Sequence, residues 1–191
     1  MISKTYRNWF TLFLLPLFPI SKSQPFSECT HCRAQFPLSI DEINSRVAEG
    51  ERQQSADAIR LYNSLRHSPA NCVTLNDLIR LYGSLKEYDQ AISAAGEFPE
   101  ALQNSEQVMT ALARVHLAKE DFDGALHWFD QAIQKNDQYA EPFFHRAVAL
   151  MTKPQPDLDA ARAAARTAKN LGHLGADDLI REIAAKQTPP V

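Results

Sequence analysis

The fold is decided by one stretch, Val108–Asn136 (VMTALARVHLAKEDFDGALHWFDQAIQKN), which has the pattern of two helices joined by a short polar turn. In each half the apolar residues recur every three or four positions, as they do along one face of a helix. The polar turn consists of Lys119–Asp121 and Asp123. Ala125 lies where the two helices must cross closely, so the stretch predicts an antiparallel helical hairpin.

Copies of this hairpin lie on both sides of it. A single hairpin cannot bury its apolar face alone, so neighbours of the same kind are expected. One copy precedes it at a 34-residue spacing and another follows at the same spacing, although the second helix of the later copy is displaced by two positions because the turn Lys153–Pro156 is longer. The matching residues are Leu75, Leu78, Tyr82, Tyr88 and Ala91 in the earlier copy, and Phe143, Ala147, Leu150, Leu158, Ala161, Ala165 and Ala168 in the later one.

Three hairpins in register with a 34-residue period resemble the tetratricopeptide-repeat (TPR) family. The matching motifs are LNDLIRLYGSLKEYDQAISAAGEFP, MTALARVHLAKEDFDGALHWFDQAI and FFHRAVALMTKPQPDLDAARAAARTA, within residues 72–171. The sequence departs from the family pattern at Ile79, Arg146 and Asp137, where a small residue, a core leucine and a closing proline are usual. The resemblance implies an all-α fold, a right-handed α-solenoid of antiparallel helical hairpins with a C-terminal capping helix.

The rest of the chain is divided by turn signals. Ile40, Ile43 and Val47 mark a helix that Gly50 is predicted to end, and a second helix follows before Pro69; a non-repeat N-terminal cap is the alternative to this hairpin. In chain order the predicted segments are a signal peptide or N-terminal anchor (1–23), a cysteine-containing arm (24–38), a degenerate first hairpin (39–71), TPR units (72–105, 106–139 and 140–173) and a capping helix with a tail (174–191).

Residues 1–23 have the features of a targeting segment. Lys4 and Arg7 accompany a twelve-residue apolar run, Trp9–Ile20, and the segment contains no acidic residue. The run is short for a membrane span, which needs about 20 residues, and prolines interrupt it. The pattern favours a secretory signal cut before Gln24, with an uncleaved anchor or a mitochondrial presequence as alternatives. The predicted location is therefore outside the cytoplasm, in a bacterial periplasm or secreted, or at a membrane through the N-terminus.

The three cysteines are the reactive groups of the chain: Cys29 and Cys32 lie in the arm, and Cys72 begins the first repeat. In an oxidising compartment they favour a structural disulfide, either Cys29–Cys32 or one of these with Cys72. A thiol–disulfide exchange site, a zinc site that adds His31, and free thiols are the alternatives. An odd number leaves one thiol for an intermolecular bond. The prediction includes no metal and no cofactor.

The inner wall of the predicted solenoid indicates a binding surface. The first helices of the hairpins line the concave side, so their residues outside the core face a groove. Arg80 and Arg114 occupy the same place in successive repeats and stack along this wall, where two guanidinium groups can hold a carboxylate or merely pair with neighbouring acids. Phe144 and Val148 would add an apolar shelf. The predicted groove residues are Asn76, Asp77, Arg80, Thr110, Arg114, Phe144, His145 and Val148.

The TPR resemblance implies a use for this groove. Proteins of the family typically bind peptide segments there, some through a carboxylate clamp built from lysine, arginine and asparagine. Asn76, Arg80 and Arg114 resemble part of such a clamp, but its lysines are missing from this sequence.

The residue inventory indicates a binding protein rather than an enzyme. The chain has 191 residues, a soluble composition and a net charge of −3, without the basic excess that nucleic-acid binding needs. No Ser/His/Asp order, paired-carboxylate site or phosphate-binding loop occurs. We therefore predict a non-catalytic adaptor or assembly factor whose partner is a protein or peptide with an acidic or carboxylate-bearing segment. A thiol-dependent protein that uses Cys29–Cys32 while the repeats dock its substrate, and a homo-oligomeric structural protein, are the alternatives.

Overall fold

The computed structural model describes residues 2–4, 7–12, 15–22, 26–28, 35–36 and 40–187. The chain divides into two compact units, Met1–Ala56 and Asp57–Val191. Each unit is described by itself. Cys29 and Cys32 lie outside the described residues, so the predicted disulfide stays a prediction.

Short antiparallel strands precede the helix of the first unit. They form a three-stranded sheet in the order β1-β4-β5 and a separate hairpin of β2 and β3, in which Phe10 lies opposite Phe18. The sequence pattern did not predict strands here, although aromatic and β-branched residues suit β-structure. The predicted export signal is not tested by them. The strands are β1 (Ile2–Lys4), β2 (Arg7–Leu12), β3 (Leu15–Lys22), β4 (Phe26–Glu28) and β5 (Gln35–Phe36).

The first helix, α1 (Ile40–His67), runs without a break through Gly50. The predicted helical hairpin over residues 39–71 is therefore wrong. Glycine inside a helix costs only about 1 kcal/mol, and here no proline follows it to enforce a stop. In the second unit, Ala58 and Leu65 of α1 are buried, so the end of this helix packs on the first repeat. Among the described residues, α1 and the other helices all lack a stretch apolar enough to span a bilayer.

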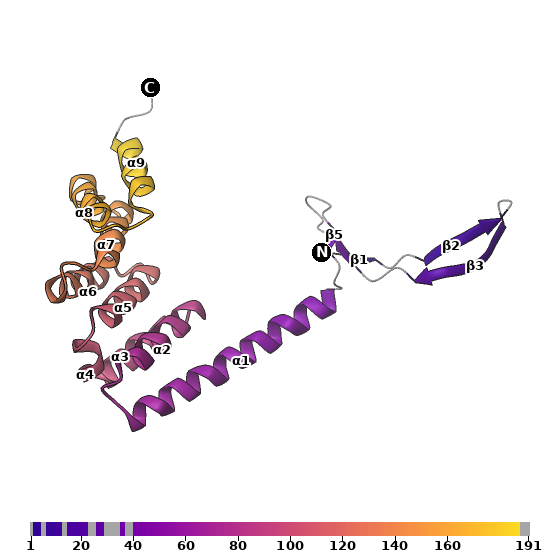
Figure 1. Cartoon of the computed structure of the whole chain (residues 1–191), viewed down its shortest axis with the longest axis horizontal. Coiled ribbons are helices and arrows are strands. Elements are labelled where there is room, and N and C mark those ends of the chain that lie inside the picture. Colours follow the sequence, from indigo (N-terminus) through magenta and orange to yellow (C-terminus); the bar gives the residue numbers. More distant parts are fainter. Residues whose placement is uncertain are drawn as a thin grey trace. The chain divides into compact units, whose positions relative to one another are not determined.

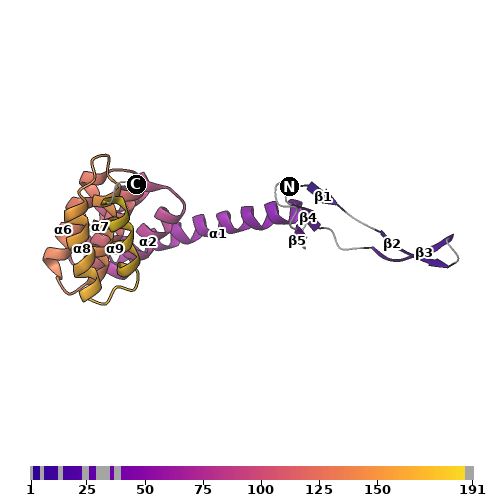
Figure 2. The same cartoon turned by 90° about the horizontal axis from the view of Figure 1, so that it is seen from above.

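Three helical hairpins and an end helix follow α1 in the second unit (Figure 1). Each hairpin packs on the next, and Figure 2 shows α6 and α8 together on one side with α7 and α9 beside them. A short extra helix, α4 (Pro99–Gln103), begins at a proline and separates the first two hairpins. The predicted all-α solenoid with a capping helix is confirmed for this unit. Its hairpins are α2 (Cys72–Ser84) with α3 (Tyr88–Glu97), α5 (Glu106–Ala118) with α6 (Phe122–Lys135), and α7 (Ala140–Thr152) with α8 (Leu158–Asn170), and α9 (Ala176–Gln187) is the end helix.

The buried core of this unit is narrowest at its centre. One cluster of buried residues extends from α1 to α5 and includes Ala132 of α6, and another joins α7, α8 and α9. Between them lie only four buried residues, Ala113, Ala125, Phe129 and Ala149. Ala125 is fully buried, as expected for a position where two helices cross closely. Phe129 is the one large side chain among these four, and the partly buried Leu117, Leu126 and Trp128 pack against them.

The residues that cap the first helices repeat with the hairpins. The side chain of Asn71 accepts the backbone N–H of Thr74, and that of Ser105 accepts the N–H of Val108, at 3.1 and 3.3 Å. The equivalent position before α7 is Tyr139, which makes no capping bond with its side chain. Tyr139 is thereby left to face the groove described below.

Two turn residues, Lys86 (φ 60°) and Glu120 (φ 62°), have a left-handed backbone conformation. They occupy equivalent positions of the 34-residue period, in the turns inside the first two hairpins. A side chain in this conformation costs about 1 kcal/mol, a cost that glycine avoids. We expect Glu120→Gly to raise the free energy of unfolding by about 0.5 kcal/mol, since the flexibility that glycine gives the unfolded chain offsets part of the gain. Urea denaturation of Glu120→Gly and Glu120→Ala tests this, because alanine removes the same charge but keeps the strain. Equal stability of the two variants would contradict the expectation.

The carboxylate of Asp121 caps α6 and bonds a histidine. Its Oδ1 accepts the N–H of Gly124 at 3.0 Å, and its Oδ2 lies 2.7 Å from Nδ1 of His116. The bond from Gly124 and then the contact with His116 lower the pKa of Asp121. A cap whose pKa is lowered on folding stabilises the protein above the unfolded value, about pH 4, and this contribution is lost as pH falls through the folded pKa.

Asp121→Asn is therefore expected to remove an acid-dependent part of the stability. Asparagine keeps a capping oxygen but lacks the charge. Since the carboxylate is 46% exposed, the loss at about pH 6 should stay under about 1 kcal/mol, and it should vanish toward about pH 2. Urea midpoints of both proteins across this range measure the difference. A difference that does not change with pH would show that the charge contributes nothing.

Candidate functional site

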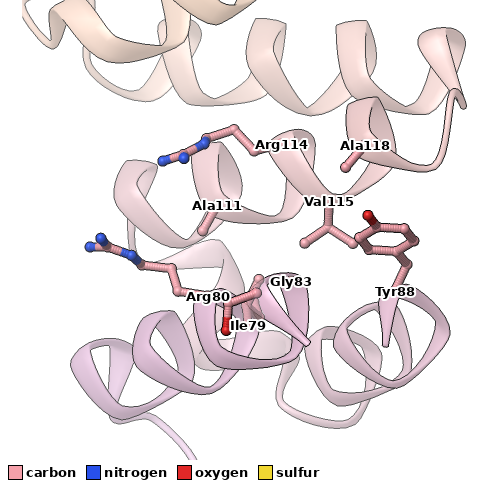
Figure 3. A pocket seen from close by; sticks show the side chains of 9 residues that line it. Ile79, Arg80, Gly83, Tyr88, Ala111, Arg114, Val115 and Ala118 are labelled. Atoms are coloured by element: carbon pink, nitrogen blue, oxygen red, sulfur yellow. The ribbon is translucent and has the colours of Figure 1, made fainter. Parts of the chain in front are cut away.

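Arg80 on α2 and Arg114 on α5 lie on neighbouring helices and extend to the same side (Figure 3). Because α2 packs directly against α5, two residues that are 34 positions apart in the sequence lie next to each other on neighbouring helices. Both arginines are exposed. The predicted stacking of these two residues along one wall is present in the structure.

An apolar pocket of about 360 Å³ opens beside the two arginines. Tyr88 lies at the end away from the guanidinium groups, next to Val115 and Ala118 (Figure 3). Space is left here because several lining residues are small. The lining consists of Ile79, Arg80, Gly83, Ser84, Tyr88, Ala111, Arg114, Val115 and Ala118.

A smaller polar pocket of about 150 Å³ lies on the other side of the arginines. It shares Arg80, Ala111 and Arg114 with the apolar pocket, so the guanidinium pair stands between the two. Its remaining lining carries amide, hydroxyl and carboxylate groups. These residues are Asn76, Gln107, Thr110, Tyr139 and Glu141.

The charges of the groove are only partly balanced. Arg114 Nη1 lies 3.9 Å from Glu141 Oε1, at the limit of an ion pair. The same carboxylate is approached by Nε2 of His145 at 3.3 Å and by Nε2 of His173 at 3.2 Å. No carboxylate of the described residues comes within ion-pair distance of the Arg80 guanidinium. The groove therefore presents one arginine without an ion pair and one weakly paired.

Tyr139 adds a hydroxyl to the polar pocket. Its pKa is raised, first by burial and then by the negative charges of Glu141 and Glu106. The phenol therefore stays neutral at physiological pH and can donate a hydrogen bond to a ligand. Tyr139 was not predicted as a groove residue, although its 34-residue spacing from Ser105 would have placed it at the start of a first helix.

The third hairpin contributes less to the groove than predicted. Phe144 stacks on the His173 ring, with centroids 3.9 Å apart and planes 15° apart. Phe144 and Val148 also pack in the cluster that α9 completes. A Cβ atom on Gly175 would lie 3.3 Å from Phe144, so the turn before α9 fits closely over this ring. The expected apolar shelf is thus covered by the chain itself.

The other predicted site residues fall in different places. Thr110 is 2% exposed and its hydroxyl donates to the Glu106 carbonyl at 2.6 Å, so the hydroxyl hydrogen is not available to a ligand. Asp77 is exposed on α2 but lines neither pocket. His145 is largely buried, and Cys72 is half-buried as a free thiol at the start of α2. Within the part of the chain that the structure describes, no three His, Cys, Asp or Glu side chains gather where a metal ion could bind.

Comparison with known proteins tests the fold. No family model and no curated protein matches this sequence. Among solved structures, the first TPR of Spaghetti (RPAP3) bound to the HSP90 peptide SRMEEVD has a TM-score of 0.55 with 19% identity, covering 60% of this chain and 91% of that one. The chain has the TPR fold. Two structures of MamA are also similar, with TM-scores of 0.55 and 0.53 and identities of 14% and 17%, covering 73% and 78% of this chain and 91% and 96% of theirs.

These likenesses concern the TPR fold alone, because the identities are low. They agree with the helical hairpins that the 34-residue period predicts. In one of the similar structures the TPR unit carries a bound peptide. What this chain binds has to be argued from its own groove.

Proposed function

We propose that this protein is a non-catalytic adaptor that binds an acidic peptide segment of a partner protein in the groove between α2 and α5. The observation that carries the proposal is the guanidinium pair of Arg80 and Arg114 standing between an apolar and a polar pocket. Arginine forks form charge-assisted hydrogen bonds with carboxylates, and an arginine that has no ion pair among the described residues can offer them to a ligand.

The two pockets indicate how such a segment would lie. A carboxylate would bind Arg80 and Arg114, while an adjacent aliphatic side chain would enter the apolar pocket toward Tyr88. On the other side, Asn76, Gln107 and the neutral phenol of Tyr139 offer hydrogen bonds to the peptide backbone. The predicted ligand therefore combines negative charge with one apolar residue.

The peptide in the RPAP3 structure supports this class of ligand. Its sequence, SRMEEVD, combines acidic residues with the apolar residues methionine and valine. That peptide belongs to the other protein, and the departure of this chain from the usual clamp lysines means that the preferred sequence can differ.

Selection from a random heptapeptide library with free C-termini tests the proposal. We expect enrichment of peptides with two or more acidic residues and at least one large aliphatic residue. Fluorescence anisotropy should then show that replacing the acidic residues by their amides weakens binding at least about tenfold, and that added salt weakens it as well. Enrichment without acidic residues, or binding that ignores the amide replacement, would overturn the proposal.

A further inference from the structure

We propose that Glu141 competes with an acidic ligand for Arg114, and that protonation of His145 and His173 weakens this competition, so that the groove binds acidic peptides more tightly as pH falls. This inference rests on the function proposed above and adds its regulation. It concerns the one carboxylate that lines the polar pocket.

Both oxygens of Glu141 are engaged by groups from separate parts of the chain. Oε1 lies 3.9 Å from Nη1 of Arg114 on α5 and 3.3 Å from Nε2 of His145 on α7. Oε2 lies 3.2 Å from Nε2 of His173, in the turn between α8 and α9. The Glu141 side chain is still 33% exposed, so it can move away from Arg114 without leaving an empty space in the core.

The hydrogen-bond pattern defines the neutral form of His173. The backbone N–H of Gly175 donates to its Nδ1 at 3.2 Å, so the ring hydrogen is on Nε2 and is donated to Glu141. Protonation of this ring occurs at Nδ1, so it breaks the bond from Gly175, and it places a full positive charge next to the carboxylate. Glu141 is then held more strongly by His173, and Arg114 becomes available to a ligand.

The surroundings of His145 disfavour its protonation in the free protein, and the binding of an anion reduces this effect. Its pKa is lowered, first by burial and next by the positive charge of Arg114, while Glu141 opposes this and the neighbouring His173 adds to it. A ligand carboxylate that neutralises Arg114 removes part of this lowering. Binding an anion and taking up a proton therefore favour each other, as linkage requires.

The remaining groups that face Glu141, His145 and His173 do not reverse the expected pH dependence of binding. Tyr139 precedes α7 and stays neutral because its pKa is raised. Glu106 on α5 and Arg80 on α2 act on Tyr139 with opposite signs, since Glu106 raises its pKa and Arg80 lowers it.

The first test uses the peptide SRMEEVD as the probe in isothermal titration calorimetry. We expect its affinity for the wild-type chain to rise about threefold between about pH 7.5 and about pH 6. This is the size of effect that a partly exposed ion pair such as Arg114–Glu141 contributes. Titrations in buffers of different ionisation enthalpy should show proton uptake on binding. Glu141→Gln should bind the probe about threefold more tightly at about pH 7.5 and lose most of the pH dependence.

Matched variants distinguish the effect of Glu141 and His173 on binding from the effect of a changed net charge. Glu182→Gln removes the same charge from the exposed face of α9 and should leave affinity and pH dependence unchanged. His173→Gln keeps a neutral donor but cannot be protonated, so it should flatten the pH dependence, whereas His127→Gln on α6, away from the groove pockets, should not. Tight binding that does not change with pH in the wild type, or with Glu141→Gln, would overturn the inference and leave the proposed function standing.

A second test needs no ligand. Phenylglyoxal modifies accessible arginines, and peptide mass spectrometry compares Arg114 with Arg80 as an internal reference. The ratio of Arg114 to Arg80 modification should rise about threefold in Glu141→Gln and stay constant in Glu182→Gln. An unchanged ratio would refute the competition for Arg114. A raised ratio in a chain that binds no acidic peptide would instead refute the proposed function.

Discussion

Phe129→Ala is expected to lower the free energy of unfolding by about 3–5 kcal/mol. Phe129 is fully buried on α6, and its companions in the central cluster are the small residues Ala113, Ala125 and Ala149. The alanines cannot fill the volume of a lost phenyl ring, and the partly buried Leu117, Leu126 and Trp128 that pack against this cluster would fill only part of it, so a cavity would remain. A loss of this size is a large part of the roughly 5–15 kcal/mol that holds a domain of ordinary stability together.

The same position joins the two halves of the solenoid. The Phe129 ring lies parallel to that of His145, with centroids 6.1 Å apart and planes 11° apart. Because the larger clusters on either side are connected through this narrow centre, the variant should unfold in two urea transitions instead of one. Circular dichroism during urea denaturation measures both effects. Phe143→Ala, at a half-buried position on α7, is the control and should cost clearly less; a comparable loss in both variants would contradict this account.

The double variant Arg80→Glu with Arg114→Glu should lose acidic-peptide binding by a factor on the order of 100 or more. A hydrogen bond to a charged group contributes about 1.5–3 kcal/mol, and each step of about 1.4 kcal/mol is tenfold in affinity. The variant removes both guanidinium groups and replaces them with carboxylates that repel the ligand. Since both arginines are exposed, the fold should be retained, and circular dichroism checks this.

A matched control carries the same charge change elsewhere. Arg162 and Arg166 lie on α8 and line neither of the two groove pockets. Reversing both should leave capture of a partner from a native extract unchanged, whereas reversing the groove pair should abolish it. Persistence of the same partner in the groove variant would place the binding surface elsewhere.

Much of the fold could be predicted from the spacing of apolar residues. The 34-residue repeat located three hairpins because each copy must bury the same face against its neighbour. Gly50 misled the prediction for α1, since the cost of one glycine is smaller than the gain from continuing a helix. The strands before α1 were not predicted either, because an apolar run rich in aromatic residues is compatible with a targeting segment as well as with a β-hairpin.

The site was predicted in part, for a similar reason. Arg80 and Arg114 share a repeat position, so their proximity follows from the period alone. The stacking of His173 on Phe144 follows from no period, because it depends on how the turn before α9 folds back over α7. Pocket lining by Tyr88 and Glu141 likewise depends on neighbouring helices, whose packing determines which side chains remain accessible.

The shared wall of the two pockets has a consequence for the kind of molecule that can compete for the groove. A group seated in one pocket holds the next part of its chain at a high effective concentration beside the other, so two weak contacts on one chain strengthen each other. A small dicarboxylate has no apolar side chain for the apolar pocket, so it lacks the second of these two contacts. Abundant metabolic acids should therefore be poor competitors, and the groove can stay available to a polypeptide ligand in their presence.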